Sequence, residues 1–580
     1  MDLSSKRYWH LLLHMNDGVS EIDDQRFFFA EDGKINSKHE LEATLNAMLN
    51  ETKFDDNSSA CRFPARKEWL RQELNITNFP QVQCTQYNKI LKRINPKSAT
   101  LVFPSAHINS PASMFGHTFL RINSAYKSQL LSYAINYAAN ANADTENGVV
   151  FAIKGLFGGY YGQYSLLPYY EKLKEYRDTE QRDIWEYNLN LNESEVLKMV
   201  QHMWELNGTH SNYYFTTENC SYNMFWFMEI ARPSVKLRDY FNYQVIPLET
   251  IHATSSEGLI KSDYYRASKR TILLEYENLL KPNYLALPKK LVNSQIKINE
   301  ILNNTKIPLQ QKMYILEASI EFLEYSFSKN DMDKNVYLEL FHNITKARAS
   351  LGMGEKLNIK PPPNPLESHR AVKATVGFGF RDEESISFLG IRPTYHNLED
   401  SNYGFLRGTQ IEFLDLVFSY TQDKIEVEDA TILSIASLAQ RSEFFNNFSW
   451  RTKFGWDKNY LDDKTNFIAT VGAGYSWGNE LAYTYIMIDP LFYVENKFVT
   501  ALNASTGLCI DKYKFMSTNI EVSRRYYDSG YQQNLIKVAQ SFRLSQNVQL
   551  KFKYDYKERA INEANEEDEQ TYKALINYYF

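Results

Sequence analysis

The chain alternates apolar and polar residues from about Arg370 to Phe580. The clearest example is VQLKFKYDYKE, in which one face of an extended chain is apolar or aromatic and the other is polar. The first face holds Val548, Leu550, Phe552, Tyr554 and Tyr556, and the second holds Gln549, Lys551, Lys553, Asp555 and Lys557. A period of two predicts β-strands, because successive side chains of a strand point to opposite faces.

The number and composition of these segments predict a membrane barrel. About twelve strand-like segments lie between Arg370 and Phe580, and bacterial outer-membrane barrels have an even number of tilted, roughly ten-residue strands. Only a closed barrel pairs the backbone of such strands within lipid. The aromatic content of 14%, with 41 Tyr, suits the aromatic girdles of these barrels. The alternative is a soluble β-sandwich or lipocalin-like barrel, which does not account for the repeated outward Tyr and Phe.

The end of the chain carries a second barrel signal. YKALINYYF places Ala574, Ile576, Tyr578 and Phe580 on one face, and it resembles the C-terminal assembly signal of outer-membrane barrels. Twelve strands leave a narrow lumen filled by side chains, so we do not expect a wide pore.

The 580 residues are too many for one ordinary core, so we expect several domains. We assign 1–95 to a helical lead-in domain, 96–280 to an α+β catalytic domain, 281–369 to a helical spacer with a Pro-rich linker, and 370–580 to the barrel. The net charge of −6 gives no nucleic-acid signal. The mean hydropathy of −0.47 excludes a polytopic helical membrane protein. MDLSSKRYWHLLLHM is no signal peptide, so we expect a mature form or a wrongly assigned start.

The segment YYFTTENCSYNMFWFMEIARP places Cys220 at the start of a predicted helix. Thr216, Thr217 and Asn219 are all good N-cap residues, and an apolar run follows them. The unpaired N–H groups and the helix dipole at such a position favour the thiolate. The same N–H groups can stabilise an oxyanion. A cysteine before an apolar helix is more often a small buried residue, but the polar neighbours of Cys220 favour a nucleophile.

A base for that nucleophile is found about a hundred residues earlier. His117 follows Gly116 and begins a strand-like run, and a second such run, LLSYAINYA, follows. A histidine on a strand is more often structural, although the adjacent glycine indicates a close backbone approach. Asn136, on the second run, is our candidate for the group that orients His117, with Ser132 on the same face. Either Gln163 or a backbone amide would complete the oxyanion hole.

Four cysteines occur in the chain, and two of them predict a disulfide. Cys61 and Cys84 lie in one small segment, where a bond would form in an oxidising compartment. The alternative is two unrelated buried thiols. Without a CxxC pair, we expect no structural zinc and no cofactor. Arg62 and Arg66 could bind an anionic group, but a salt-bridged surface is the simpler interpretation.

Four segments occur in an order that resembles a known family: SPASMFGHTFLRI, GGYYGQYSLLPYY, RDIWEYNLNL and ENCSYNMFWFMEIARP. Over about Ser98 to Pro233 the chain is similar to the Lnb N-terminal periplasmic domain family. The leading CRFPAR segment and the trailing barrel also resemble the flanks of this domain. The order, His first and Cys later, looks like the permuted papain-like superfamily, which includes lecithin–retinol acyltransferase-like enzymes and is related to NlpC-type peptidases. The resemblance implies a periplasmic thiol enzyme with His117 and Cys220 at the catalytic positions.

These features together predict a function and a location. We expect a barrel in the bacterial outer membrane that carries a periplasmic Cys-His enzyme. Lnb-type proteins are associated with lipoprotein N-acylation, so the resemblance implies an acyltransferase that acts on phospholipid or lipoprotein through an acyl-thioester on Cys220. One alternative is a peptidoglycan amidase or endopeptidase of NlpC type. Another is a non-catalytic assembly or binding protein of the outer membrane. We expect the lipid bilayer as a partner, and no nucleic acid.

Overall fold

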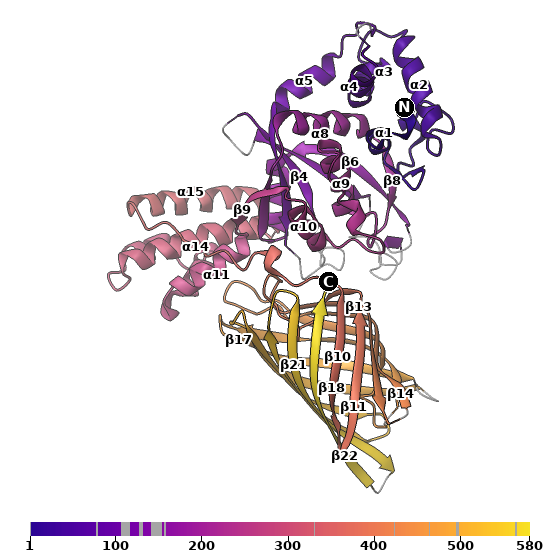
Figure 1. The fold of residues 1–580 in the computed structure, drawn as a ribbon. Coiled ribbons are helices and arrows are strands. Elements are labelled where there is room, and N and C mark those ends of the chain that lie inside the picture. Colours follow the sequence, from indigo (N-terminus) through magenta and orange to yellow (C-terminus); the bar gives the residue numbers. More distant parts are fainter. Residues whose placement is uncertain are drawn as a thin grey trace. The chain divides into compact units, whose positions relative to one another are not determined.

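The computed structural model describes residues 2–76, 79–105, 116–126, 131–140, 154–155, 158–329, 331–422, 424–462, 464–494, 498–562 and 565–580. The chain divides into two compact units. The first comprises Met1–Ile272 with Glu324–Asp333, and the second comprises Leu273–Leu323 with Lys334–Phe580. The predicted lead-in and catalytic segments therefore share one unit (Figure 1).

The second unit contains a closed antiparallel barrel, as the alternation predicted. Twelve strands of the described chain close into a ring, because β11 pairs with β10 on one side and with β13 on the other. The short β12 (Thr394–His396) pairs with β13 beside this ring. The ring strands are β10 (Lys373–Arg381), β11 (Glu384–Arg392), β13 (Thr409–Thr421), β14 (Lys424–Ser437), β15 (Ser449–Asp457), β16 (Asn466–Gly478), β17 (Ala482–Val494), β18 (Phe498–Ile510), β19 (Met516–Tyr527), β20 (Gln532–Arg543), β21 (Val548–Asn562) and β22 (Asn565–Tyr579).

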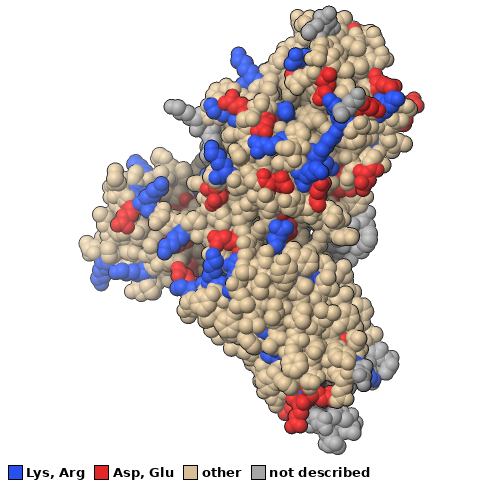
Figure 2. Space-filling model, in the orientation of Figure 1, with Lys and Arg blue, Asp and Glu red and all other residues tan. Residues whose placement is uncertain are grey.

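The two faces of the barrel wall differ in the way that a membrane protein requires. On β17, Ile486 and Ile488 are each 54% exposed, whereas Tyr485 and Asp489, which flank this pair, point into the lumen and are buried. On β21, Phe552 is exposed and Lys551 is buried, as the alternation predicted. Figure 2 shows a barrel wall that is almost free of charged side chains. An apolar outer band on a closed barrel is the surface that lipid covers.

The first unit is built on a seven-stranded antiparallel sheet of the described residues, in the order β8-β6-β5-β4-β3-β7-β9. The helices α8 and α9 pack on this sheet and on each other. The strands are β3 (Pro96–Pro104), β4 (Phe119–Ser124), β5 (Tyr133–Ala139), β6 (Tyr160–Pro168), β7 (Ile184–Leu189), β8 (His210–Tyr213) and β9 (Ile260–Arg266). The helices beside them are α7 (Tyr169–Leu173), η5 (Lys174–Thr179), α8 (Glu193–Leu206), α9 (Cys220–Ala231), η6 (Arg238–Tyr240) and α10 (Pro247–Ser256).

The lead-in segment packs onto the same unit through a buried ion pair. Arg66, which we expected on a salt-bridged surface, is fully buried and lies 2.7 Å from Glu40. Its backbone N–H donates to Glu205 on α8, and its guanidinium lies over Phe27 and Phe63. The elements here are η1 (Leu3–Ser5), α1 (Arg7–Leu12), β1 (Met15–Asn16), β2 (Val19–Ser20), η2 (Gln25–Phe27), α2 (Ser37–Leu49), α3 (Ser59–Arg62), α4 (Pro64–Glu73) and α5 (Thr85–Ile94).

Between the sheet and the barrel the chain is helical, as predicted. The expected hairpin or three-helix spacer contains more pieces than that, because Pro282, Pro288 and Pro308 each stand at or just before the start of a helical element. The pieces are α11 (Lys269–Leu279), η7 (Pro282–Tyr284), α12 (Leu287–Val292), α13 (Ile298–Leu302), α14 (Leu309–Ser328), α15 (Lys334–Ser350) and η8 (Pro365–Glu367). None of the described helices is long and apolar enough to cross a membrane.

Candidate active site

The helix α9 begins at Cys220, and Asn219 alone of the three predicted residues caps it. The Asn219 side-chain oxygen accepts hydrogen bonds from the backbone N–H groups of Ser221 (3.0 Å) and Tyr222 (3.2 Å). Its amide donates to the carbonyls of Phe215 and Val245. These hydrogen bonds on both sides of Asn219 fix the first turn of α9. Cys220 therefore lies at the positive end of the helix dipole. The helix α8 is likewise capped by an asparagine, because the Asn192 side chain accepts a hydrogen bond from the Glu195 backbone N–H.

His117 lies beside Cys220, two residues before β4 begins. A hydrogen bond joins the imidazole to the thiol. The close backbone approach inferred at Gly116 is present, because a Cβ there would lie 2.6 Å from the ring of Phe103, and φ is +89°. The other face of the site is aromatic, since the His117 ring stacks on Tyr176 at 5.6 Å between centroids. The glycine therefore lets the chain turn tightly just before His117 and the start of β4, the central strand of the sheet.

Asn136 lies on β5 and contacts His117, as its place on the second run predicted. The Nε2 atom of His117 is 3.0 Å from Oδ1 of Asn136, so this nitrogen donates to the amide oxygen. That bond leaves the other ring nitrogen for the thiol. Ser132 is buried just before β5, and its carbonyl accepts from Tyr169. The order Cys220–His117–Asn136 is that of a thiol, a base and an orienting group.

The electrostatics of the site favour an ion pair between the thiol and the imidazole. Burial opposes ionisation of Cys220, but the charge of His117 and its hydrogen bond lower the pKa of the thiol to about 7. The Thr118 N–H and the Ser221 hydroxyl also donate to the sulfur. Burial alone would lower the pKa of His117, yet the neighbouring thiolate raises it above the ordinary value. Each partner therefore stabilises the charged form of the other.

A residue that the sequence analysis missed completes the site. The Tyr213 hydroxyl, at the end of β8, accepts a hydrogen bond from the Cys220 backbone N–H at 3.2 Å. Burial and the charge of Cys220 raise the pKa of Tyr213 well above its ordinary value, so the phenol keeps its proton. Its ring stacks on Tyr137 at 5.5 Å. Nothing in the sequence predicted that Tyr213 contacts Cys220. The pairing of β8 with β6 brings the Tyr213 side chain to the N-terminus of α9.

The other predicted participants lie elsewhere or outside the described residues. Gln163 is exposed on β6, opposite Ala138, and does not join the oxyanion position. Residues 106–115, which include the whole SPASMF segment, and residues 141–153 are outside the described residues. Cys61 and Cys84 form the predicted disulfide, while Cys220 is free and buried.

One group in the described chain has the donor atoms for a metal ion: His369, His396 and Asp400, with those atoms within 4.8 Å of one another. The carboxylate of Asp400 is already committed to Arg392 at 2.6 Å and to the Tyr579 hydroxyl at 2.9 Å. The nearby guanidinium also repels a cation. We therefore assign no metal to this group.

Comparison with protein families matches three stretches of the chain. Residues 86–257 match the Lnb N-terminal periplasmic domain. Residues 1–73 and 362–579 match two domains of unknown function, DUF7843 and DUF7840. A comparison with curated proteins finds no match.

Solved structures similar to this chain include porins and a channel. The KdgM porin is 12% identical, over 36% of this chain and 99% of that chain, with a TM-score of 0.24. The NanC porin is 9% identical, over 36% and 100%, with a TM-score of 0.25. An outer-membrane channel from Pseudomonas putida F1 is 11% identical, over 39% and 99%, with a TM-score of 0.25.

The closed barrel with its apolar wall and the periplasmic domain define the class: this is an outer-membrane β-barrel protein with a periplasmic N-terminal portion. Within that class, residues 86–257 are an Lnb N-terminal periplasmic domain. The resemblance to the Lnb N-terminal periplasmic domain family and the outer-membrane location inferred from the sequence are thereby confirmed.

Proposed function

We propose that this protein is a cysteine-dependent acyltransferase of the outer membrane that forms an acyl-thioester on Cys220. The observation that carries the proposal is the placement of Cys220, His117 and Asn136 in hydrogen-bonded order, with the thiol pKa at about 7. A thiol in that state is an effective nucleophile at neutral pH. The arrangement of a thiol at a helix N-terminus beside a histidine at the start of the central strand β4 supports a papain-like division of labour.

The first chemical step is attack on an ester carbonyl. His117 holds the thiol proton, and the Cys220 sulfur forms a bond to the carbonyl carbon while the carbonyl oxygen becomes an oxyanion. The Cys220 N–H is engaged by the Tyr213 hydroxyl oxygen, so the Tyr213 O–H is the donor that we assign to this oxyanion. As the oxyanion collapses, the ester C–O bond breaks and His117 gives its proton to the departing alkoxide. A thioester and a free alcohol result.

The second step returns the enzyme to its starting state. An incoming amine attacks the thioester, His117 accepts a proton from the amine, and the C–S bond breaks to release an amide. With water as the acceptor, the same steps give hydrolysis. Asn136 acts through His117 and is a positioning residue, because its amide oxygen holds the Nε2–H.

The membrane location supports a lipid-derived acyl donor. A barrel with an apolar outer wall keeps the chain at a phospholipid bilayer. Phospholipid esters and acylated proteins are then the carbonyl compounds at highest local concentration. The match of residues 86–257 to the Lnb N-terminal periplasmic domain supports a periplasmic position for the site.

Intact-protein mass spectrometry tests this function directly. The full chain is incubated briefly with phospholipid vesicles, quenched with acid and compared with Cys220→Ser. We expect a mass increase of one fatty acyl chain that hydroxylamine removes and that Cys220→Ser lacks. Absence of the adduct in folded protein would reject the lipid donor, and muropeptides would then be tested. A thiol inert to alkylating probes would reject catalysis altogether.

A further inference from the structure

The connection between β11 and β13, residues 393–408, folds into the barrel lumen. Its Leu398 carbonyl accepts a hydrogen bond from Asn519 on β19 at 3.1 Å. The Glu399 carbonyl accepts from Ser541 on β20 at 2.8 Å and from Gln549 on β21 at 3.1 Å. A connection that leaves β11 therefore reaches distant strands of the ring, and it crosses the lumen to do so. We call residues 397–405 the first inner turn.

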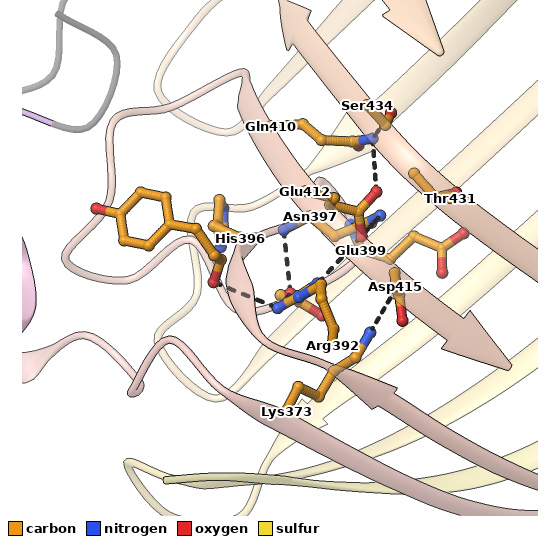
Figure 3. Close-up of polar contacts among 12 residues, drawn as sticks. Lys373, Arg392, His396, Asn397, Glu399, Gln410, Glu412, Asp415, Thr431 and Ser434 are labelled. Carbon is orange, nitrogen blue, oxygen red and sulfur yellow. Dashed lines mark hydrogen bonds and ion pairs between the residues drawn. The ribbon is translucent and has the colours of Figure 1, made fainter. Parts of the chain in front are cut away.

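Charged side chains hold the first inner turn to the wall. The Glu399 carboxylate lies 3.0 Å from Lys553 and 3.4 Å from Lys551, both on β21. Figure 3 shows Glu399 within a cluster of lumen-facing side chains, with Arg392 linked to Glu412 and Asn397 linked to Glu412. These bonds come from strands on several sides of the lumen, so the turn is tied across it.

The rim of the barrel anchors the end of the same turn. Arg407 donates from Nε to Oδ2 of Asp511 at 2.7 Å, and Asn402 donates to the same oxygen at 2.7 Å. Leu398 packs against the buried cluster of Tyr483, Tyr485, Met487, Cys509 and Leu438. Polar and apolar contacts thus both oppose withdrawal of the turn.

A second connection closes the opposite end. Because the strands are antiparallel, residues 393–408 lie at the end that carries both termini of the barrel, and Lys458–Asp462 lie at the other. The Asn459 carbonyl accepts from Arg525 on β19 at 2.6 Å, and the carbonyls of Lys458 and Asp462 accept from Lys557 on β21. Lys458–Asp462 follow β15 and reach across the lumen. We call these residues the second inner turn.

Aromatic packing fills the space around the second inner turn. The Tyr460 ring lies 5.0 Å from the Tyr493 ring and 5.6 Å from the Tyr527 ring. Leu461 joins the same buried cluster as these two tyrosines. The far end of the lumen is therefore closed by apolar contact as well as by hydrogen bonds.

Two cavities lie between the turns, with volumes of about 300 Å³ and about 260 Å³, and the smaller one also has apolar side chains in its lining. Both are lined by Asn397 and Glu399 of the first inner turn and by Asn459 of the second. Oδ1 atoms of Asp415 and Asp555 on the first cavity, and of Asn503 and Asn519 on the second, have no hydrogen-bond partner in the described chain. Cavities of this size and polarity hold water.

The charges that line the larger cavity balance. Eight lysines face eight acidic side chains there, and many of them pair directly, as Lys573 does with Asp555 at 3.0 Å. A channel that selects ions presents rings of one sign of charge to them. A lumen whose charges satisfy each other across its width gives no such preference.

We propose that the barrel is a sealed membrane anchor: a water-holding chamber that the two inner turns close at both ends, and not a passage for solutes. The hydrogen bonds and ion pairs of the two inner turns with the wall are the seals. This proposal does not depend on the activity of Cys220.

Planar-bilayer recording of the full chain tests the seals. In one variant Gly-Gly-Ser replaces residues 398–405, in a second Gly-Ser replaces 458–462, and a third carries both changes. Arg441→Ala is the matched control, since Arg441 lies on another connection at the termini end and pairs with Asn446. Heat-dependent migration in gels establishes that each barrel is folded.

We expect the native chain, the control and both single variants to show no stable conductance, and the double variant to conduct ions steadily. Steady conductance by the native chain would overturn the proposal, and this outcome requires no variant to fold. A folded but silent double variant would also overturn it. A single variant that conducts as strongly as the double variant would show that the remaining turn is not a seal.

Discussion

At the scale of single residues, the reactivity of Cys220 depends on where its proton lies. The thiol lies at a helix N-terminus beside His117 and two further hydrogen-bond donors, the Thr118 N–H and the Ser221 hydroxyl, yet it is buried. Burial and charge pairing act in opposite directions on its pKa, and pairing outweighs burial. The thiolate is therefore half formed near neutral pH, and it belongs to one coupled pair with the imidazole.

The pH dependence of alkylation tests this balance. In a Cys509→Ser background, the rate of iodoacetamide reaction should rise with pH through about 7, because the thiolate forms above the pKa of Cys220. In His117→Ala the rise should move at least about one unit upward, which makes reaction at pH 7 about tenfold slower. Cys220→Ser supplies the blank. An unshifted profile in His117→Ala would disprove the pairing.

Tyr213 makes a separate prediction at this scale. Tyr213→Phe keeps the ring stacked on Tyr137 and removes only the hydroxyl. We expect acyl-enzyme formation to slow by about a hundredfold, the cost of losing one oxyanion donor, with the alkylation profile of Cys220 nearly retained. Rapid-quench mass spectrometry measures the rate. Tyr161→Phe is the control, because the Tyr161 side chain on β6 is exposed. Equal rates of acyl-enzyme formation in the two variants would show that Tyr213 is not an oxyanion donor.

At the scale of elements, the cap of α9 joins stability to reactivity. Asn219 satisfies two backbone N–H groups of the first turn and two carbonyls of the preceding and following segments. A buried N–H without a partner is costly, so the cap should matter more than an exposed one. The capped first turn of α9 therefore contributes to the site together with the thiol.

Replacement of the cap tests this role. Asn219→Ala should destabilise the first unit by about 2 kcal/mol, or several degrees in its melting temperature. Asn219→Asp keeps the acceptor for Ser221 and Tyr222, and it should lose less. Near-UV circular dichroism of the full chain in micelles follows the transition. An alanine variant that melts with the native chain would contradict the assignment.

At the scale of the whole molecule, the chain combines a membrane barrel with a periplasmic unit that carries a disulfide. Cys61 lies on α3 and Cys84 precedes α5, and Trp204 on α8 donates to the Cys61 carbonyl at 2.8 Å. The bond thus fastens the lead-in segment beside the sheet domain. An oxidising compartment preserves it, as the periplasmic location requires.

Reduction of this bond should affect one unit only. We expect dithiothreitol to lower the stability of the first unit by about 3 kcal/mol, since the bond closes a loop with a sequence separation of 23. The barrel, whose Cys509 is unpaired, should keep its heat-dependent migration. Limited proteolysis near 77–84 measures the change. In a Cys61→Ala/Cys84→Ala chain, dithiothreitol should not change the stability of the first unit. If it did not change the stability of the native chain either, the prediction would be contradicted.

The sequence by itself determined the local features of this protein. The side chains of a membrane barrel strand must alternate between the lipid face and the lumen. Twelve strands and their outward aromatic residues could therefore be predicted from the order of residues. The apolar run after Asn219 predicted α9, and the two runs around His117 predicted its neighbour Asn136. The pair Cys61 and Cys84 was readable because its partners are close in the chain.

Only the tertiary structure decided which distant side chains meet. Tyr213 reaches Cys220 through the pairing of β6 with β8, and Arg66 is buried because α4 packs against α2 and α8. The inner turns seal the lumen by bonds to strands more than sixty residues away. Such contacts depend on register and ring closure, which join segments far apart in the chain, whereas periodicity is a property of neighbours.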